Sequence, residues 1–551
     1  MKSTYMLSAA AGLAVILCQG PSAMRAVAQN ETALAGQVSS AAEGAMEGVV
    51  VTARKTGSIV SVSVITDAKG HYAFPESRLE PGHYTLAIRA VGYDLAAPAA
   101  TDVVGEKTAN VDLKLQPTKD LPDQLTNAEW LMSVPGTENQ KAVLLDCTSC
   151  HTLERIVKST HNVDEWMQTV SRMKGYGAVS QPIKPQPMLD RSRAGKPEEF
   201  RKFAEYLATI NLSATDHWQY QLKTMPRPTG ASTKVIVTEY DLPRKTIEPH
   251  DILRDAEGNV WYTNFGEMFI GKFDPKTLKH TEYAIKTFKP DAPKGLLSIE
   301  FDHTGKIWFD TMYQGSLGCL DPKTGEIAYY PVPKEWNDDR VQLNFTGLHY
   351  EVDNKVWTKS VGTQDIFRVD LKTGQWEKFH PTDSLPDVKH AGIYQVMSDS
   401  QNNLWMAEFT EGHLGKIDAK TLKVTWYATP TAHARARRME IDEHDNVTFT
   451  EYRGNKVAVF DPKTEKFTEY PLPPHTYPYR ANFDKNGDIW ASTMSTDRVV
   501  RLHPKTGVAE QYLTPSDTNM RTVYVDNSTN PVSFWVGSNH DHALVKVEPL
   551  E

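Results

Sequence analysis

The sequence from about residue 233 to residue 551 repeats one pattern. Typical units read "GNVWYTNFGEMFIGKFDPKTLKHTEYAI" and "GKIWFDTMYQGSLGCLDPKTGEIAYYPVP", in which an aromatic residue anchors short runs of strand-forming residues. The anchors are Trp261, Trp308, Trp357, Trp405, Phe449, Trp490 and Trp535. A period of about 40 to 50 residues with four short strands per unit is typical of a β-propeller. The seven anchors therefore predict seven blades.

The start of this region also predicts how the ring closes. Residues 234–243, "KVIVTEYDLP", have the pattern of a strand that ends a blade, but no blade precedes them. The last blade stops at "ALVKVEPLE" without such a strand. Because an open ring leaves unpaired strand edges, we expect the early strand to complete the last blade.

Residues 33–117 alternate apolar and polar side chains and are rich in Val, Thr, Tyr and Gly, with turn signals such as "DAKG" and "EPGH". This pattern predicts a small antiparallel β-sandwich. The segments "ITDAKGHYAF", "LEPGHYTLAIRAVGY" and "ANVDLKL" resemble the carboxypeptidase regulatory-like domain, a small immunoglobulin-like sandwich. The resemblance implies a structural or adhesive role without catalysis.

The first 28 residues have the features of an export signal. Lys2 supplies a positive start, residues 7–18 form an apolar core, and a small-x-small cleavage pattern ends at Ala28. We therefore expect a periplasmic or secreted protein that is cleaved near Ala28. No later segment is apolar enough to span a membrane. The net charge of -9 argues against a nucleic-acid partner, because such proteins need a basic surface.

Between these regions, at residues 120–213, the periodicity becomes helical. Segments such as "NVDEWMQTVSRMKGYG" and "KPEEFRKFAEYLATINL" place apolar residues three or four positions apart. The sequence therefore predicts a multidomain chain. It would consist of a small β-sandwich (33–117), an all-α domain (120–213) and a seven-bladed β-propeller (233–551).

The all-α region contains the motif "CTSCH", which is formed by Cys147, Cys150 and His151. A structural zinc site would need a second pair of ligands, and His161 is the one other histidine in this region. A redox disulfide would be expected in a strand–helix unit, whereas these surroundings are helical. The export signal and the helical setting favour a covalent heme with His151 as an axial ligand of the iron.

This region resembles the small class I c-type cytochromes, which have a helix before the motif ("TENQKAVLLD") and an aromatic-containing helix after the distal ligand ("EEFRKFAEYLATI"). The resemblance implies a cytochrome c domain with one covalent heme c that transfers electrons. Met173 lies in a "W…V.RM…YGA" segment similar to that of the cytochrome subunits of sulfite dehydrogenases, where the methionine binds iron. Met188, in "KPQPMLD", is the alternative sixth ligand.

The propeller repeat "D…GN.W.TE…G.I...DP.TG...EY.LP" resembles the streptogramin (virginiamycin B) lyase family of seven-bladed propellers. The clearest match is "EPHDILRDAEGNVWYTNFGEMFIGKFDPKT". In that family a histidine opens a blade and a glutamate follows fourteen residues later. Together with Mg²⁺ they break a C–O bond in a cyclic depsipeptide. The resemblance therefore implies Mg²⁺ as a possible cofactor if the chain is a lyase.

The same pair is not found within one blade of this sequence. His250 opens the first blade, but the residue fourteen positions later is Asn264, and an amide is neither a general acid nor a general base. Glu408 and Glu451 occupy the glutamate position of later blades that lack the histidine. This pattern argues against lyase activity unless the site is rearranged.

The inner strands nevertheless carry many polar residues, which predict a binding site at the propeller mouth or a set of mutually satisfied side chains. The candidates are His250, Asp251, Asn264, Glu267, His390, Tyr394, Glu408, Arg435, Arg437, Glu440, Glu451, Tyr479 and Arg480. The first hypothesis is a periplasmic c-type heme protein that carries electrons, with a propeller that binds a small-molecule ligand or a redox partner protein. The alternatives are a lyase with an appended cytochrome and a non-catalytic binding or scaffold protein.

Overall fold

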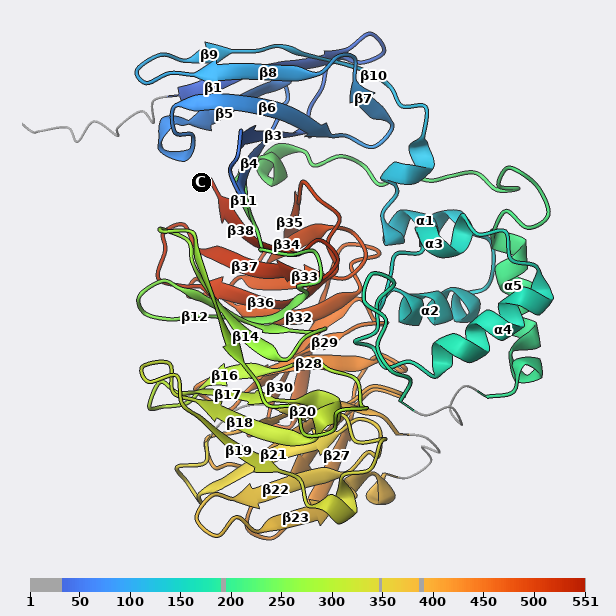
Figure 1. Cartoon of the computed structure of the whole chain (residues 1–551), viewed down its shortest axis with the longest axis vertical. Helices are drawn as coiled ribbons and strands as arrows, with labels where there is room; N and C mark the ends of the chain where they lie inside the picture. The colour runs from blue at the N-terminus through green and yellow to red at the C-terminus, as the bar shows by residue number, and fades with distance from the viewer. Residues whose placement is uncertain (1–31, 190–194, 346–348, 386–390, 551) are drawn as a thin grey trace, which may run out of the picture.

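A computed structural model describes residues 32–189, 195–345, 349–385 and 391–550. The predicted export signal and His390 lie outside these residues. The chain forms a β-sandwich above a β-propeller, with a group of short helices beside the propeller (Figure 1).

The sandwich consists of ten strands among the described residues. They are β1 (Thr32–Ser40), β2 (Gly44–Ala45), β3 (Val50–Lys55), β4 (Val60–Ile65), β5 (His71–Pro75), β6 (Gly82–Arg89), β7 (Tyr93–Leu95), β8 (Ala99–Val103), β9 (Ala109–Asn110) and β10 (Leu113–Pro117). Every second side chain of these strands points into the sandwich, and Val51, Tyr72 and Phe74 are buried there in a common core.

The propeller contains six four-stranded antiparallel sheets within the described residues. They are β12 to β15 (Pro249–Arg254, Val260–Asn264, Phe269–Asp274, Lys279–Ala284), β16 to β19 (Ile299–Phe301, Ile307–Asp310, Ser316–Leu320, Ile327–Pro331), β20 to β23 (Leu343–Phe345, Lys355–Ser360, Ile366–Asp370, Trp376–Phe379), β24 to β27 (Ile393–Ser398, Leu404–Glu408, His413–Ile417, Val424–Ala428), β28 to β31 (Ala436–Ile441, Val447–Glu451, Lys456–Asp461, Lys466–Pro471) and β32 to β35 (Pro478–Phe483, Ile489–Thr493, Arg498–His503, Val508–Leu513). A seventh sheet begins with β36 (Met520–Asp526), β37 (Ser533–Ser538) and β38 (Ala543–Pro549). Its inner strand β36 contacts both β32 and β12, so the ring is closed.

A hydrogen bond between two repeated residues accounts for four of the seven aromatic anchors. In four blades an aspartate in the turn between the first two strands accepts the indole N–H of the tryptophan six positions later. The pairs are Trp261–Asp255 (2.8 Å), Trp308–Asp302 (3.1 Å), Trp405–Asp399 (3.0 Å) and Trp490–Asp484 (2.8 Å). Each indole is therefore buried with its donor satisfied, which is what a buried tryptophan requires.

Strand β11 (Val235–Asp241) pairs antiparallel with β38, which confirms the predicted ring closure. The other edge of β11 pairs with β4 of the sandwich, so one eight-stranded sheet runs through both parts. Successive side chains of β11 point to opposite faces of the sheet. Ile236 therefore packs in the sandwich core, while Val235 and Val237 pack in the last blade. The sandwich and the propeller are thus joined by a continuous sheet.

The predicted all-α cytochrome c domain is wrong. The protein consists mostly of β-strands, and the described part of the intervening segment contains α1 (Asn127–Ser133), α2 (Glu138–Cys147), α3 (Glu154–Val157), α4 (Val163–Lys174) and α5 (Arg201–Ile210), joined by irregular chain. Its hydrophobic core is shared with the propeller, since Trp166 and Leu207 belong to the same buried cluster as Tyr452, Tyr479 and Met494. Helical periodicity reveals an apolar face but does not identify what covers it. We call residues 121–222 the helical segment.

Candidate functional site at the mouth of the propeller

The "CTSCH" motif lies directly on the last blade of the propeller. The backbone carbonyl of Thr148 accepts a hydrogen bond from Asn519 Nδ2 at 3.0 Å, and that of Ser149 accepts one from Arg521 Nη2 at 2.9 Å. Backbone carbonyls that are removed from water need such partners. The helical segment is seen beside the propeller strands in Figure 1. The motif and the last blade are therefore in direct contact.

The motif begins where α2 ends, at Cys147. The thiol of Cys150 lies 3.7 Å from the carbonyl oxygen of Ala178. Burial raises the pKa of Cys147 to about 12 and that of Cys150 to about 11. Such free thiols stay protonated at neutral pH, which disfavours disulfide exchange because that reaction requires a thiolate. Among the described residues, moreover, there is no group of three or more His, Cys, Asp or Glu side chains placed to hold a metal ion.

His151 is oriented for a ligand. Its Nδ1–H donates to the carbonyl of Thr152 at 2.9 Å, which leaves Nε2 with a free lone pair. Burial lowers the pKa of His151, so the neutral imidazole is favoured. A metal-binding histidine commonly donates its other ring N–H to a backbone carbonyl in this way.

Several large apolar side chains of the helical segment are exposed. Val143 lies one helical turn before Cys147, and Met173 lies in the last turn of α4, next to the lysine whose ammonium acts on the Cys147 thiol. Met173 is 42% exposed and Ile183 is 61% exposed, although both are large hydrophobic residues. Met188 is half-buried and its backbone pairs with that of Tyr176. The helical segment therefore presents apolar surface of the kind that a bound apolar group covers.

The propeller side of the site is built on irregularities in the inner strands. In five blades the register shifts by a β-bulge at the start of the inner strand. The residues at these bulges are His250, Tyr394, Arg437, Tyr479 and Arg521. A bulge re-aims a side chain away from the regular pleat, and here it brings the five side chains to the mouth.

His250 and Asp251 form the first half of this buried cluster. His250 Nδ1 lies 2.6 Å from Asp251 Oδ1, and its Nε2 lies 3.3 Å from Tyr479 Oη. Burial lowers the pKa of His250 to about 4, so the ring is neutral at pH 7. Burial alone would raise the pKa of the Asp251 carboxyl, but Arg438 at 3.3 Å holds it well below its usual range. These contacts make an ionised Asp251–Arg438 pair beside a neutral histidine.

Arg437 lies in an aromatic cage. Its guanidinium carbon is 4.3 Å from the ring centroid of Tyr452, 4.5 Å from that of Tyr479 and 4.8 Å from that of Tyr394. Burial would raise the pKa of the Tyr394 phenol, but the positive charges of Arg437 and its arginine neighbours outweigh that effect and lower it. The mouth therefore combines buried cations with phenol groups.

The other predicted site residues do not join this cluster into a lyase site. Glu408 accepts backbone N–H groups of the turn after its own strand, including Glu411 at 2.9 Å and Gly412 at 3.0 Å. Glu451 lies beside Glu469, and burial raises its pKa to about 8. Neither carboxylate is hydrogen-bonded to His250 among the described residues.

Five further predicted residues make structural contacts. Asn264 accepts the backbone N–H of Gly266 at 3.0 Å, and Glu267 pairs with Arg244 and Lys184. Arg480 pairs with Glu440, and Arg435 lies 3.2 Å from Asp146 of the helical segment. The pair formed by Arg435 and Asp146 links the two parts of the site at its rim.

Sequence reasoning missed Arg438, Arg521 and Glu248. Arg521 occupies the bulge position that His250 and Arg437 occupy in their blades, so an alignment of the repeats would have found it. Glu248 precedes the first inner strand, is 2% exposed, and has no hydrogen-bond partner for its carboxyl oxygens. No pattern in the sequence distinguishes it from a loop glutamate.

Comparisons with known proteins agree with two of the three regions. The carboxypeptidase regulatory-like domain matches residues 33–116, and the virginiamycin B lyase family matches residues 384–549. The chain therefore contains a carboxypeptidase regulatory-like domain and a virginiamycin B lyase-like propeller. Neither of these two matches covers the helical segment, and no curated protein matches the chain.

Similar solved structures include a streptogramin B lyase, which is 21% identical, covers 58% of this chain and 100% of its own, and has a TM-score of 0.49. A selenomethionine-substituted virginiamycin B lyase from Staphylococcus aureus is 20% identical, covers 57% of this chain and 100% of its own, and has a TM-score of 0.48. The extracellular domain of a one-component system from B. thetaiotaomicron is 18% identical, covers 55% of this chain and 40% of its own, and has a TM-score of 0.42. The described residues include no helix that is long and apolar enough to cross a membrane.

Proposed function

We propose that the protein is an exported heme protein that transfers single electrons, and that its propeller binds a small ligand or a redox partner beside the heme attachment loop. The observation that carries the proposal is the orientation of His151. This histidine directly follows Cys150 and donates Nδ1–H to a backbone carbonyl at 2.9 Å, so that Nε2 is the ring nitrogen with a lone pair. That arrangement suits an axial ligand of iron.

Each residue of the attachment loop has a role in this proposal. Cys147 and Cys150 would hold the porphyrin edge through thioether bonds, and His151 Nε2 would bind the iron. Met173 would provide the sixth ligand, with Met188 as the alternative. Covalent heme c supplies one-electron chemistry when it is bound. Export is consistent with covalent attachment outside the cytoplasm.

The propeller fixes the position of the loop that carries the two cysteines. Arg521 and Asn519 hold the carbonyls of Ser149 and Thr148, so the loop between the two cysteines cannot shift without breaking two hydrogen bonds. A ligand at the propeller mouth would therefore lie next to the redox centre. This geometry supports transfer of electrons between the mouth and the attachment loop.

The proposal is tested by expressing the chain with its export signal and with heme-attachment machinery. We expect a reduced spectrum with sharp bands and heme that stays on the polypeptide after denaturation. The Cys147→Ala/Cys150→Ala variant is the control and should carry no covalent heme. A wild-type chain without heme under these conditions would refute the proposal.

The sixth ligand is tested separately. Met173→Ala should abolish the methionine-to-iron charge-transfer band of the oxidised protein, while Met188→Ala should retain it. The reverse result would assign the ligand to Met188. Retention of the band in both single variants would exclude both methionines.

A further inference from the structure

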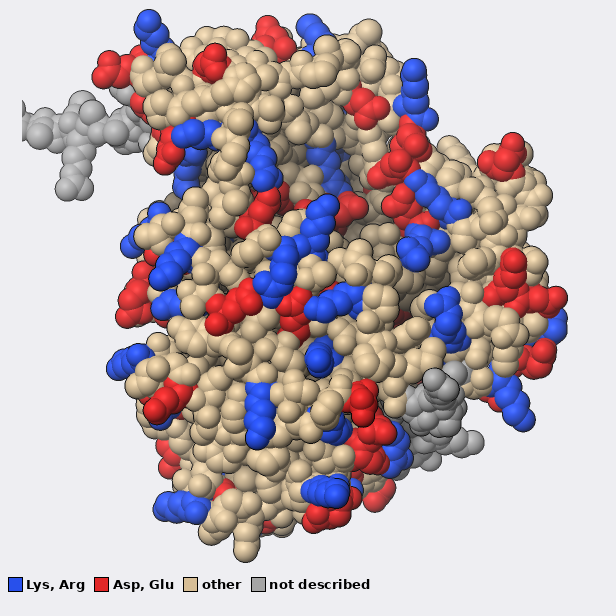
Figure 2. Space-filling view, in the orientation of Figure 1, with Lys and Arg blue, Asp and Glu red and all other residues tan. Residues whose placement is uncertain are grey.

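Two buried arginines at the propeller mouth have no carboxylate partner. Arg437 is 5% exposed and Arg521 is 3% exposed, and neither forms an ion pair within the part of the chain that the structure describes. The Nε atom of each is buried without a hydrogen-bond partner among the described residues. On the surface, by contrast, Lys and Arg are interspersed with Asp and Glu (Figure 2). A buried cation without a counter-ion is costly, so these two positions require an explanation.

The two guanidinium groups face the same weak acceptor. Arg437 Nη1 lies 2.9 Å from the sulfur of Met494, and Arg521 Nη1 lies 3.8 Å from that sulfur. A thioether sulfur carries no charge and accepts hydrogen bonds weakly. Two like charges are thus held near each other with a neutral, flexible side chain between them.

Nearby acids do not neutralise them. Asp251 is paired with Arg438 at 3.3 Å. The charge of Arg521 lowers the pKa of Glu248, but the larger effect of burial raises that pKa to about 8. The Glu248 carboxyl is therefore protonated at neutral pH. The positive charge of Arg437 and Arg521 therefore remains uncompensated by carboxylates.

We propose that Arg437 and Arg521 bind the carboxylate group of a small organic acid, which takes the place of the Met494 sulfur. An arginine fork matches a carboxylate with two parallel hydrogen bonds, and the unpartnered Nε atoms are the donors that such a pairing uses. The rings of Tyr394, Tyr452 and Tyr479 around Arg437 provide flat walls for the organic part. This inference rests on the proposed function, because it names the class of ligand that the mouth receives.

The site lies against the attachment loop. Arg521 donates one N–H to Ser149, between the two cysteines, and points another toward the Met494 sulfur. A carboxylate bound at Met494 would share Arg521 with the loop. The ligand would thereby sit beside the residues that we assign to heme attachment.

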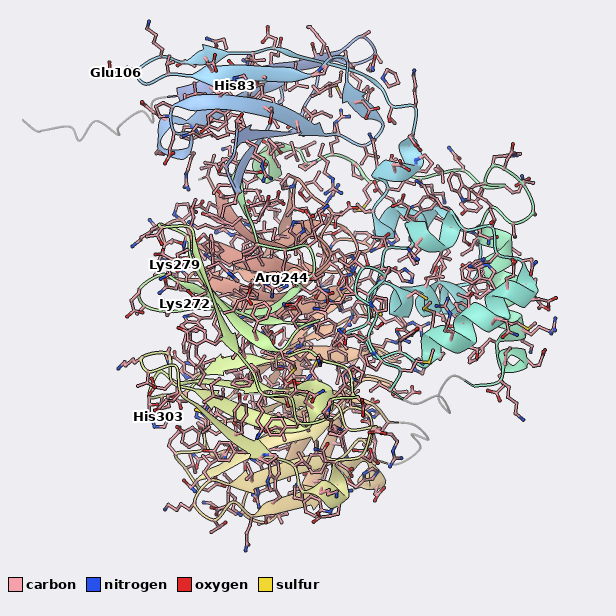
Figure 3. The ribbon with its side chains drawn as sticks, viewed as in Figure 1. His83, Glu106, Arg244, Lys272, Lys279 and His303 are labelled. Atoms are coloured by element: carbon pink, nitrogen blue, oxygen red, sulfur yellow. The ribbon has the colours of Figure 1, made fainter. Side chains whose placement is uncertain are left out.

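The experiment is calorimetric titration of the exported holoprotein with sodium acetate and with sodium benzoate, at an ionic strength kept constant with sodium chloride. We expect saturable binding, and at least a tenfold loss of affinity in Arg437→Gln and in Arg521→Gln. Lys279→Gln is the matched control, because Lys279 is an exposed cation on the side of the propeller away from the helices (Figure 3). Its affinity should equal that of the wild type.

Two measurements keep the test decisive if an arginine variant does not fold. Met494→Leu keeps the apolar volume and removes the sulfur acceptor, so it should bind acetate at least as tightly as the wild type. Absence of saturable binding to the wild type, or loss of binding in Met494→Leu, would overturn the proposal. A tyrosinate absorption band at neutral pH that is lost in Tyr394→Phe would also overturn it, because the phenolate would then supply the counter-charge.

These outcomes are separable from those of the proposed function. Heme attachment is read from the spectrum, whereas carboxylate binding is read from heat. A chain that binds acetate but never carries heme would refute the heme proposal alone.

Discussion

The loop of Cys147, Cys150 and His151 and the propeller axis lie next to each other but have opposite chemistry. The loop presents protonated thiols and a neutral imidazole, and the helical segment that carries it has exposed apolar side chains. The axis presents buried arginines, one ionised aspartate and phenol groups. The first environment suits a flat apolar group, and the second suits an anion. The contact between Arg521 and Ser149 shows that one fold can hold both within hydrogen-bonding distance.

The largest expected effect is the loss of covalent heme from the loop without a change in the axis cluster. Cys147→Ala/Cys150→Ala should lose all covalent heme, since no thioether bond can form, while the axis cluster keeps its geometry. Heme staining of a denaturing gel measures the first effect, and the near-ultraviolet circular dichroism of the aromatic cage checks the second. A collapsed near-ultraviolet spectrum would show that the two environments are not independent.

The next prediction compares the stability lost when a buried ion pair at the axis is broken with the stability lost when an exposed pair at the rim is broken. Asp251→Asn leaves Arg438 buried without its partner and should lower the free energy of unfolding by about 3 to 5 kcal/mol. Asp146→Asn removes the rim partner of Arg435 and should cost at most about 1 kcal/mol. Urea unfolding at pH 7 measures both. Equal losses would contradict the distinction between axis and rim.

The Asp251–Arg438 pair should also be visible in the pH dependence of stability. Because the pKa of Asp251 is lower in the folded protein than in the unfolded chain, its contribution is present above the unfolded pKa of about 3.9. The contribution declines as the pH falls below that value toward the folded pKa. The difference in stability between wild type and Asp251→Asn should therefore shrink below pH 4.

A separate pH effect concerns Glu248. Burial raises its folded pKa to about 8; Lys184 and Arg521 oppose this rise, and Glu267 adds to it. A raised carboxyl pKa makes folding less favourable as the pH rises from the unfolded pKa of about 4.3 toward the folded value, by about 1.4 kcal/mol per pH unit. Glu248→Gln should remove this decline between pH 5 and pH 7. Urea unfolding at several pH values measures it, with Glu257→Gln in an exposed turn as the control.

A large part of the fold could be predicted because its signals are local. The spacing of Trp261, Trp308 and the other anchors indicates the blades, and the unpaired strand at residues 234–243 indicates how the ring closes. The motif at Cys147, Cys150 and His151 is equally local, so it was found without the structure. The all-α domain was predicted wrongly because amphipathic helices look alike whether they pack on each other or on a propeller.

The axis could be predicted only in part. His250, Tyr394, Arg437 and Tyr479 were named, but Arg521 was not. The hydrogen bonds of the described residues do not join Glu408 or Glu451 to His250, as a rearranged lyase site would require. The repeat shows which residues occupy equivalent positions in different blades. It does not show which blades face each other across the mouth. The β-bulges that aim these side chains leave no clear mark in a single sequence.

By itself, the sequence determined the blade repeat, the closing strand, the sandwich and the "CTSCH" motif, because each depends on residues close together in the chain or on a regular period. The tertiary structure alone decided that the helical segment shares its core with Tyr452, Tyr479 and Met494, and that Arg437 and Arg521 meet at one sulfur atom. These contacts join residues from separate blades and from the helical segment. They arise from ring closure and from burial of an apolar helix face against the propeller, and no local pattern encodes them.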